Sequence, residues 1–197
     1  MFNPSDSLST VLPLQSKNLN DFVPKGWTIL FQNDIQLTGK KGKNYIFAIE
    51  QDSNKDNRIV FVVIQSKKGI YQLNAANSKV VLGPSNSGRF GDMFVSLDTA
   101  KNAFTISHYH GSYWNHGSEI TFSYKSGQWT LSKGVGCAIT ELGSEDGGGK
   151  ASVYYVKPGE KFQNFDYFVE PVTIFEKIVA IEKLGKYFKY GHAQCQY

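Results

Sequence analysis

Between residues 92 and 133, apolar and polar side chains alternate over four short segments, and this alternation constrains the fold more than any other feature of the chain. The segments are 92–98, 103–108, 119–124 and 128–133. A period of two residues is typical of a strand that buries one face and exposes the other. Because the links between the segments are short, successive strands should pair antiparallel. The pattern therefore predicts an antiparallel meander.

The chain before this block is also strand-like. Segment 44–50 is rich in aromatic and β-branched residues, and residues 59–64 within segment 58–65 form an unbroken apolar run. Such a run predicts a central strand that is buried on both faces. The polar stretch 52–57 predicts a hairpin turn between the two strands. Further short strand candidates are 70–73, 79–82 and a segment around Val153 and Tyr155.

Neither end of the chain shows this strand-like pattern. Residues 1–22 are rich in Ser, Asn and Leu, which indicates an extended arm or tether before a single domain over 23–197. In segment 172–185 apolar residues recur at nearly helical spacing, and Pro171 and Gly185 flank them, although the β-branched residues also allow a strand. The predicted fold class is α+β and β-rich, an antiparallel meander sheet or sandwich with a C-terminal amphipathic helix.

The charge of the chain argues against a nucleic-acid partner, and its apolar pattern argues against a transmembrane segment. Among 197 residues, 21 are Lys or Arg and 17 are Asp or Glu, which gives a net charge of +4. Only Arg58 and Arg89 are arginines, whereas nucleic-acid surfaces usually cluster their basic residues and use Arg forks. We therefore expect no nucleic-acid partner. We also expect no transmembrane segment, because the longest apolar run is far shorter than the roughly 20 residues that a spanning helix needs.

The cysteines leave the redox state open. Cys137 and Cys195 are far apart and neither belongs to a CxxC pair, so the usual spacing for structural zinc or for thioredoxin-type chemistry is absent. They fit either a disulfide that pins the C-terminal tail or two unpaired thiols. No apolar signal segment follows Met1, so we expect a cytoplasmic protein or an exported one whose signal has been removed.

Functional residue types gather where the meander brings three loops together. Antiparallel pairing of its first two segments places the loop 84–92 beside the link 109–117, and its last segment delivers the loop after Gly134 to the same end. The candidate binding residues of this rim are Arg89, Asp92, His108, Tyr109, His110, Tyr113, Trp114 and His116. Aromatic and Arg side chains dominate the energetics of protein–protein interfaces, so the rim favours recognition of a protein partner.

The rim also admits a metal site and acid–base catalysis. His108 and His110 are two residues apart on a strand, and His116 or Asp92 would complete a three-ligand shell. Equally, His108 would close the core face of its strand. Acid–base catalysis lacks paired carboxylates at a readable spacing, and neither GxSxG nor a Cys–His signature is present. We therefore assign no catalytic residue, metal ligand or cofactor.

A calcium loop is the remaining metal candidate. Residues 52–57 place oxygen ligands at alternate positions, as an EF-hand loop does at its start. The usual Gly is replaced by Asn57, and Val63 stands where the closing Glu is required. The stretch is therefore better interpreted as a polar turn.

Five short motifs lie within about residues 22–133: Val23-Pro24-Lys25-Gly26-Trp27, Gly91-Asp92-x-Phe94, Ile106-Ser107-His108-Tyr109, Gly111-Ser112-x-Trp114 and Phe122-x-Tyr124-x-x-Gly127-x-Trp129. Through these motifs the chain resembles an uncharacterised group of small exported proteins of Gram-negative bacteria, many of them predicted periplasmic proteins or lipoproteins and distantly FG-GAP-like. The resemblance implies export to the periplasm, allows a lipid tether and raises the expectation of a Cys137–Cys195 disulfide. The Asp-rich turn of the group is Lys/Gly-rich here, around residues 34–44.

These observations lead to one functional hypothesis and two alternatives. The hypothesis is a non-enzymatic periplasmic binding protein, most concretely an immunity or inhibitor protein that blocks a secreted toxin or cell-wall hydrolase through the loop rim. The first alternative is a metal-assisted hydrolase that uses Asp92, His108, His110 and His116. The second is a structural protein of the cell envelope.

Overall fold

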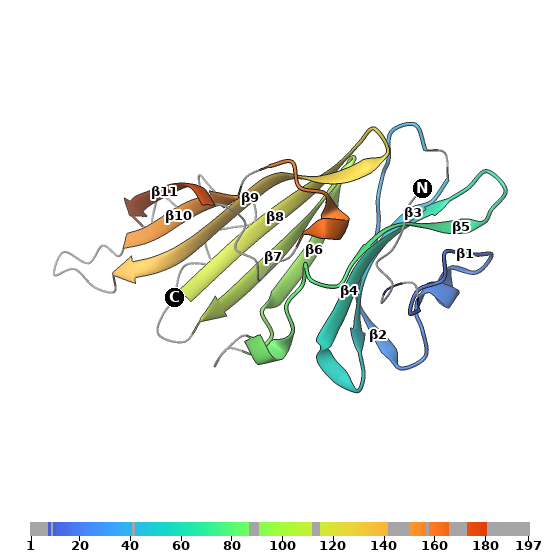
Figure 1. The fold of residues 1–197 in the computed structure, drawn as a ribbon, viewed down its shortest axis with the longest axis horizontal. Helices are drawn as coiled ribbons and strands as arrows, with labels where there is room; N and C mark the ends of the chain where they lie inside the picture. The colour runs from blue at the N-terminus through green and yellow to red at the C-terminus, as the bar shows by residue number, and fades with distance from the viewer. Residues whose placement is uncertain are drawn as a thin grey trace.

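The computed structural model describes residues 8, 10–40, 42–86, 91–111, 115–141, 150–156, 158–165 and 173–180. These residues form two antiparallel sheets, which Figure 1 shows next to each other. Sheet A has the strand order β1-β5-β4-β3-β2, and sheet B has the order β11-β10-β9-β8-β7-β6. The prediction of a β-rich antiparallel fold is confirmed.

Sheet A is built from the N-terminal half of the chain. Its strands are β1 (Gln15–Ser16), β2 (Trp27–Asp34), β3 (Asn44–Gln51), β4 (Asn54–Gln65) and β5 (Tyr71–Asn77). The predicted central strand is β4, which pairs with β3 on one side and β5 on the other. Its residues 59–63 are at most 3% exposed, so both faces of this strand are buried as its apolar run requires.

Sheet B contains the predicted meander. Its strands are β6 (Phe94–Ala100), β7 (Ala103–Gly111), β8 (Asn115–Lys125), β9 (Gln128–Glu141), β10 (Lys150–Val156) and β11 (Thr173–Ala180). Each strand from β6 to β10 pairs with the next one along the chain. Three short 3-10 helices complete the described elements: η1 (Leu19–Phe22), η2 (Pro84–Asn86) and η3 (Phe162–Asn164).

One hydrophobic core fills the space between the inner faces of the two sheets. Val60 and Val62 of β4 belong to it, together with Phe104 and Ile106 of β7. The two edge strands β2 and β6 meet along one side, where the Asn33 amide donates a 2.6 Å hydrogen bond to the Leu97 carbonyl. The two sheets therefore form a sandwich around a shared core.

The outer face of sheet A has a core of its own. Phe47, Ile49 and Phe61 point away from sheet B and are covered by the N-terminal segment, which contributes Leu12 and Phe22. Phe22 is fully buried and belongs to η1, which the Asn18 side chain caps by accepting a hydrogen bond from the Asn20 N–H. The described part of this segment therefore packs on the sheet.

The predicted C-terminal helix is wrong over the described residues. Thr173–Ala180 forms strand β11, which pairs antiparallel with β10. Ile174, Ile178 and Val179 are β-branched, so they lose side-chain freedom in a helix and suit a paired strand. Residues 172 and 181–185 of the predicted helix lie outside the described residues.

The short strand predicted at 79–82 is also wrong. These residues form the linker from sheet A to sheet B, and Val80, Val81 and Leu82 are at most 5% exposed. The Asn77 side chain accepts a 2.6 Å hydrogen bond from the Lys79 N–H, which turns the chain out of β5. Burial in the sandwich explains the apolar residues without a strand.

Candidate functional site

The strand register brings the expected loop ends together at one end of sheet B. Phe94 at the start of β6 lies opposite His108 near the end of β7, and Gly111 lies opposite Asn115 across the β7–β8 connection. His116 in turn lies opposite Ala138 of β9. The chain therefore enters β6 and β8, and leaves β7 and β9, at the same end of the sheet.

The structure describes five of the eight candidate residues at least in part. Asp92 precedes β6, His108 and Tyr109 lie on β7, and His110 lies directly opposite His116 in the β7–β8 register. Arg89, Tyr113 and Trp114 lie outside the described residues. The backbone thus brings His108, His110 and His116 to neighbouring positions, and the side-chain geometry can be followed for Asp92, His108 and Tyr109.

His108 belongs to the interior of the protein. It follows Phe104 and Ile106 on the inner face of β7 and is 0% exposed. Its ring lies 6.1 Å from the ring of Phe94, centroid to centroid. Tyr109 points to the other face and is half-buried, and its N–H donates a 2.8 Å hydrogen bond to the Met93 carbonyl. His108 therefore extends the core toward the rim and presents no surface to solvent.

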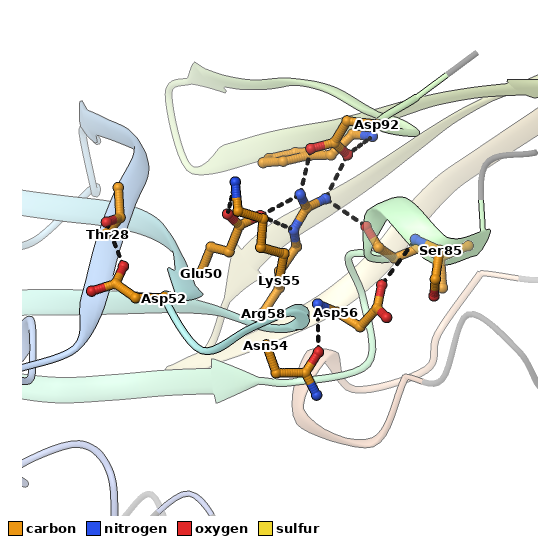
Figure 2. Close-up of polar contacts among 11 residues, drawn as sticks. Thr28, Glu50, Asp52, Asn54, Lys55, Asp56, Arg58, Ser85 and Asp92 are labelled. Atoms are coloured by element: carbon orange, nitrogen blue, oxygen red, sulfur yellow. Dashed lines mark hydrogen bonds and ion pairs between the residues drawn. The ribbon is translucent and has the colours of Figure 1, made fainter. Parts of the chain in front are cut away.

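Asp92 belongs to a network of ion pairs between the two sheets (Figure 2). The Arg58 guanidinium, on β4, lies between Asp92 and Glu50, which is at the end of β3. Its Nη1 donates a 2.6 Å hydrogen bond to Asp92 Oδ1, and its Nη2 pairs with Asp92 Oδ2. Its Nε and Nη2 both donate to Glu50 Oε2, at 3.0 and 2.5 Å. This bidentate geometry matches the guanidinium fork to two carboxylates.

Every N–H of the Arg58 guanidinium donates a hydrogen bond within the network. The fifth donor, on Nη1, makes a 2.7 Å hydrogen bond to the Leu82 carbonyl in the linker between the sheets. The Arg58 side chain is 1% exposed, and its Cζ lies 6.0 Å from the centroid of the Phe94 ring. A buried charge is tolerated only when it is paired in this way.

These contacts shift two pKa values. Burial alone would raise the pKa of Asp92, but hydrogen bonds from Arg58 and from the Phe94 N–H, with the positive charge of Arg58, hold it below its ordinary value. Burial alone would lower the pKa of Arg58, but its hydrogen bonds to Asp92 and Glu50 raise it above its ordinary value. Both groups are therefore charged at neutral pH.

The β3–β4 turn uses its carboxylates for structure. Asn54 Oδ1 accepts a 3.1 Å hydrogen bond from the Asp56 N–H, and Asp52 Oδ1 accepts a 2.7 Å hydrogen bond from the Thr28 hydroxyl. Asp56 accepts a 3.0 Å hydrogen bond from the Ser85 N–H, which anchors η2. A polar hairpin turn is confirmed at 52–53, because β3 ends at Gln51 and β4 begins at Asn54, whereas residues 54–57 of the predicted turn belong to β4.

The arrangement offers no free acid–base pair among these groups. Both oxygens of Asp92 accept hydrogen bonds from Arg58, and Oδ1 also accepts one from the Phe94 N–H at 3.0 Å. Within the part of the chain that the structure describes, no three His, Cys, Asp or Glu side chains are grouped as metal ligands. Cys137, on β9, is fully buried and disulfide-bonded, while Cys195 lies outside the described residues.

Sequence reasoning missed Arg58 and Glu50. Their signal is nevertheless present, because each charged residue borders an apolar strand segment: Glu50 follows 45–49 and Arg58 precedes 59–64. A regular two-residue turn would place Glu50 opposite Lys55, and a register shift between Glu50 and Gln51 is what brings Glu50 opposite Arg58. In the structure they are direct cross-strand partners.

The fold and this ion-pair network define a two-sheet antiparallel β-sandwich whose halves are joined by buried charges. Comparison of the chain with models of protein families, with curated proteins and with solved structures finds no match. Among the described residues, no helix combines the length and apolar character required to span a membrane.

Proposed function

We propose that this protein is a non-enzymatic binding protein of the bacterial periplasm, most concretely an immunity or inhibitor protein. Its partner is a secreted toxin or a cell-wall hydrolase, which it blocks through the loop rim at the end of sheet B. The observation that carries the proposal is the structural use of Asp92 and His108. The carboxylate is held by Arg58 and the imidazole is buried in the core, so these two groups serve the fold, which favours recognition as the chemistry of the rim.

The disulfide at Cys137 supports a location outside the cytoplasm. Disulfides persist in oxidising compartments such as the periplasm and are rare in the reducing cytoplasm. Cys137 is 0% exposed, so its disulfide is part of the packed interior. An exported protein with this cross-link is suited to meet a secreted partner.

A metal-assisted hydrolase is less well supported by the same geometry. Asp92 would have to give up its hydrogen bonds to Arg58 before it could ligate a metal ion, which would leave Glu50 as the one carboxylate on the buried guanidinium and two guanidinium N–H groups without their acceptors. Because the Asp92 side chain is 43% exposed, we expect the loss of this pair to cost about 1 kcal/mol. Binding requires no such loss.

The decisive experiment combines genetics with an inhibition assay. Deletion of the gene should make the cells sensitive to the toxin or hydrolase encoded beside it, and the purified protein should inhibit that enzyme at a stoichiometric ratio. Tyr109→Ala and His116→Ala should each weaken inhibition by roughly 30-fold, the effect of losing an interface hot spot of about 2 kcal/mol.

Lys125→Ala and Gln128→Ala are the matched controls, because they are exposed and pair with each other at the opposite end of sheet B. Their inhibition should equal that of the wild-type protein. Unchanged sensitivity on deletion, together with no inhibited enzyme, would contradict the proposal. A normal inhibition curve for both rim variants would move the binding surface elsewhere, and a phenotype without any partner would favour a structural envelope protein.

A further inference from the structure

A cavity of about 310 Å³ is lined largely by residues of the outer core of sheet A and of the β3–β4 hairpin. Its apolar wall includes Ile59 of β4, and Leu8 and Val11 of the N-terminal segment. Trp27, at the start of β2, forms an aromatic wall. Ligand sites typically begin at about 300 Å³, so the cavity has room for one small ring-shaped ligand.

Trp27 is poised to contact a ligand. It is half-buried against the outer core, while its backbone N–H is used by the Pro24 carbonyl at 3.1 Å. Its indole N–H donates no hydrogen bond within the described part of the chain, whereas the indole of Trp129 donates to Asn74 at 2.9 Å. An indole that combines an apolar face with an available donor is suited to a ligand that has an apolar face and polar edges.

The rest of the rim is rich in hydrogen-bonding groups and poor in charge. Gln51 and Asn57 line it, joined by a 2.6 Å hydrogen bond from Asn57 Nδ2 to Gln51 Oε1, which orients both amides. The remaining amide hydrogens and lone pairs are available to a ligand. The lining has two ionised groups, Asp56 and Arg58. Every N–H of the Arg58 guanidinium already donates a hydrogen bond, so Asp56 is the ionised group that can still bind a ligand, as an acceptor.

The charge of the cavity selects against anions. The hydrogen bonds from Ser85 lower the pKa of Asp56, so this carboxylate is ionised at neutral pH and repels a phosphate or carboxylate. Lys55 is exposed, and its Nζ lies 4.0 Å from Glu50. Several neutral donors and acceptors around an aromatic ring match a polyhydroxylated ring, whose C–H face stacks on the indole while its hydroxyls bind amides and a carboxylate.

We propose that this cavity binds a single neutral sugar ring, stacked on Trp27 and hydrogen-bonded by Gln51, Asn57 and Asp56. The site is separate from the loop rim, and this proposal does not depend on the proposed function.

The test is an NMR titration of the full-length protein with glucose, mannose, galactose and N-acetylglucosamine. The indole N–H resonance of Trp27, assigned from its loss in Trp27→Phe, should shift with a saturating dependence on one of these sugars. Trp27→Ala should weaken binding at least about tenfold, and Asn57→Ala about fivefold, as expected for a lost stacking face and a lost hydrogen bond.

The controls separate the site from the fold and from other ligand classes. Gln32→Ala removes an exposed amide from β2, outside the cavity lining, and should bind the sugar like the wild-type protein. Glucose 6-phosphate should bind more weakly than glucose because of Asp56. The proposal is overturned if no sugar shifts the Trp27 resonance at about 50 mM, well above a weak Kd of ~1 mM. It is equally overturned if tetramethylammonium shifts the resonance and every sugar fails to do so.

Discussion

At the residue scale, Arg58 determines how the charged groups of this protein behave. Its guanidinium is buried between Glu50 on its own sheet and Asp92 on the segment that leads into the other sheet. The contact with Glu50 spans eight residues and the contact with Asp92 spans 34. One side chain therefore connects the β3–β4 hairpin to the segment that precedes β6. The ionised form of Asp92 is needed for this contact.

The lowered pKa of Asp92 makes this tie sensitive to acid. Because the folded-state pKa is below the unfolded value, the stabilisation is complete above the unfolded pKa of about 3.9 and is lost as the pH falls through the lower folded pKa. The Asp92 side chain is 43% exposed, so water screens the pair and we expect its contribution to be about 1 kcal/mol. Urea unfolding between pH 7 and pH 2 measures it.

Asp92→Asn is the variant that isolates this effect. It should lower the free energy of unfolding at pH 7 by about 1 kcal/mol and flatten the acid limb of the pH profile. Asp98→Asn is the control, a carboxylate of β6 that does not contact Arg58. If the wild-type and Asp92→Asn profiles remain parallel down to pH 2, Asp92 does not carry the acid sensitivity.

The sequence identified Asp92 and His108 as candidate binding residues, but it did not predict that one forms an ion pair with Arg58 and the other is buried in the core. Alternation along 103–108 correctly places His108 on the same face as Phe104 and Ile106, and that parity is what buries it. The partner of Asp92 comes from another sheet, and no local pattern relates position 92 to position 58. Residue types and parity can be read from the chain, whereas a contact across the sandwich depends on how the sheets pack.

At the element scale, the linker between the sheets is fixed against the β3–β4 hairpin. Gly83 lies in this linker, and a Cβ built on it would approach the Asp56 Cα to 2.3 Å. That neighbour is backbone and cannot rotate away. Arg58 holds the Leu82 carbonyl and Asp56 holds the Ser85 N–H on either side of the glycine, so the linker cannot move outward without breaking these bonds.

Gly83→Ala should therefore destabilise the protein by about 1–3 kcal/mol, the usual range for overpacking. Gly39→Ala is the matched control, because its Cβ meets nothing within 4 Å and only its φ of +77° is penalised, at about 1 kcal/mol. Thermal unfolding followed by circular dichroism compares the two. A Gly83→Ala variant that is as stable as the wild-type protein would show that the linker is not held close to the hairpin.

The elements that sequence reasoning identified are those with one dominant period. The alternating segments became β6 to β9, and the continuous apolar run became the central strand β4. Segment 172–185 has an apolar spacing that fits a helix and β-branched residues that fit a strand, and pairing with β10 decides for β11 over Thr173–Ala180. Residues 79–82 are apolar because the linker is buried, which local pattern does not separate from a strand.

At the scale of the whole molecule, side chains of β5 connect sheet A to sheet B and to the η3 segment. The Asn74 side chain accepts the Trp129 indole hydrogen bond from β9, across the two sheets. Asn77, 3% exposed, donates to the Phe162 and Phe165 carbonyls around η3. Phe162 and Phe165 then pack on Phe122 of β8, with ring centroids 5.0 and 5.4 Å away. The segment 158–165 thus lies between the sheets as a wedge, held on the β5 side by the Asn77 amide and on the β9 side by backbone hydrogen bonds of Leu131 with Gly159 and Glu160.

Asn77→Ala should remove the two donated hydrogen bonds and the one that Asn77 accepts from the Lys79 N–H. The Phe162 carbonyl keeps a hydrogen bond from the Phe165 N–H, whereas the Phe165 carbonyl loses the Asn77 donor, so we expect a cost of about 1–3 kcal/mol. Asn77→Asp should be at least as damaging, because its carboxylate would face two carbonyl oxygens and cannot donate to them. Gln72→Ala, an exposed amide on the same strand, should leave stability within about 0.5 kcal/mol of the wild-type value. Urea unfolding at pH 7 provides the comparison.

Two probes show whether the damage spreads across the sandwich. Trp129 fluorescence, measured in a background with Trp27→Phe and Trp114→Phe, reports on the junction between β9 and β5, and far-ultraviolet circular dichroism reports on both sheets together. In the wild-type protein the two transitions should coincide, because one core joins the sheets. In Asn77→Ala the fluorescence transition should occur at lower urea than the circular dichroism transition, since the wedge loosens first. Coincident and unshifted transitions in the variant would mean that apolar packing of Phe162 and Phe165 holds the wedge without the amide.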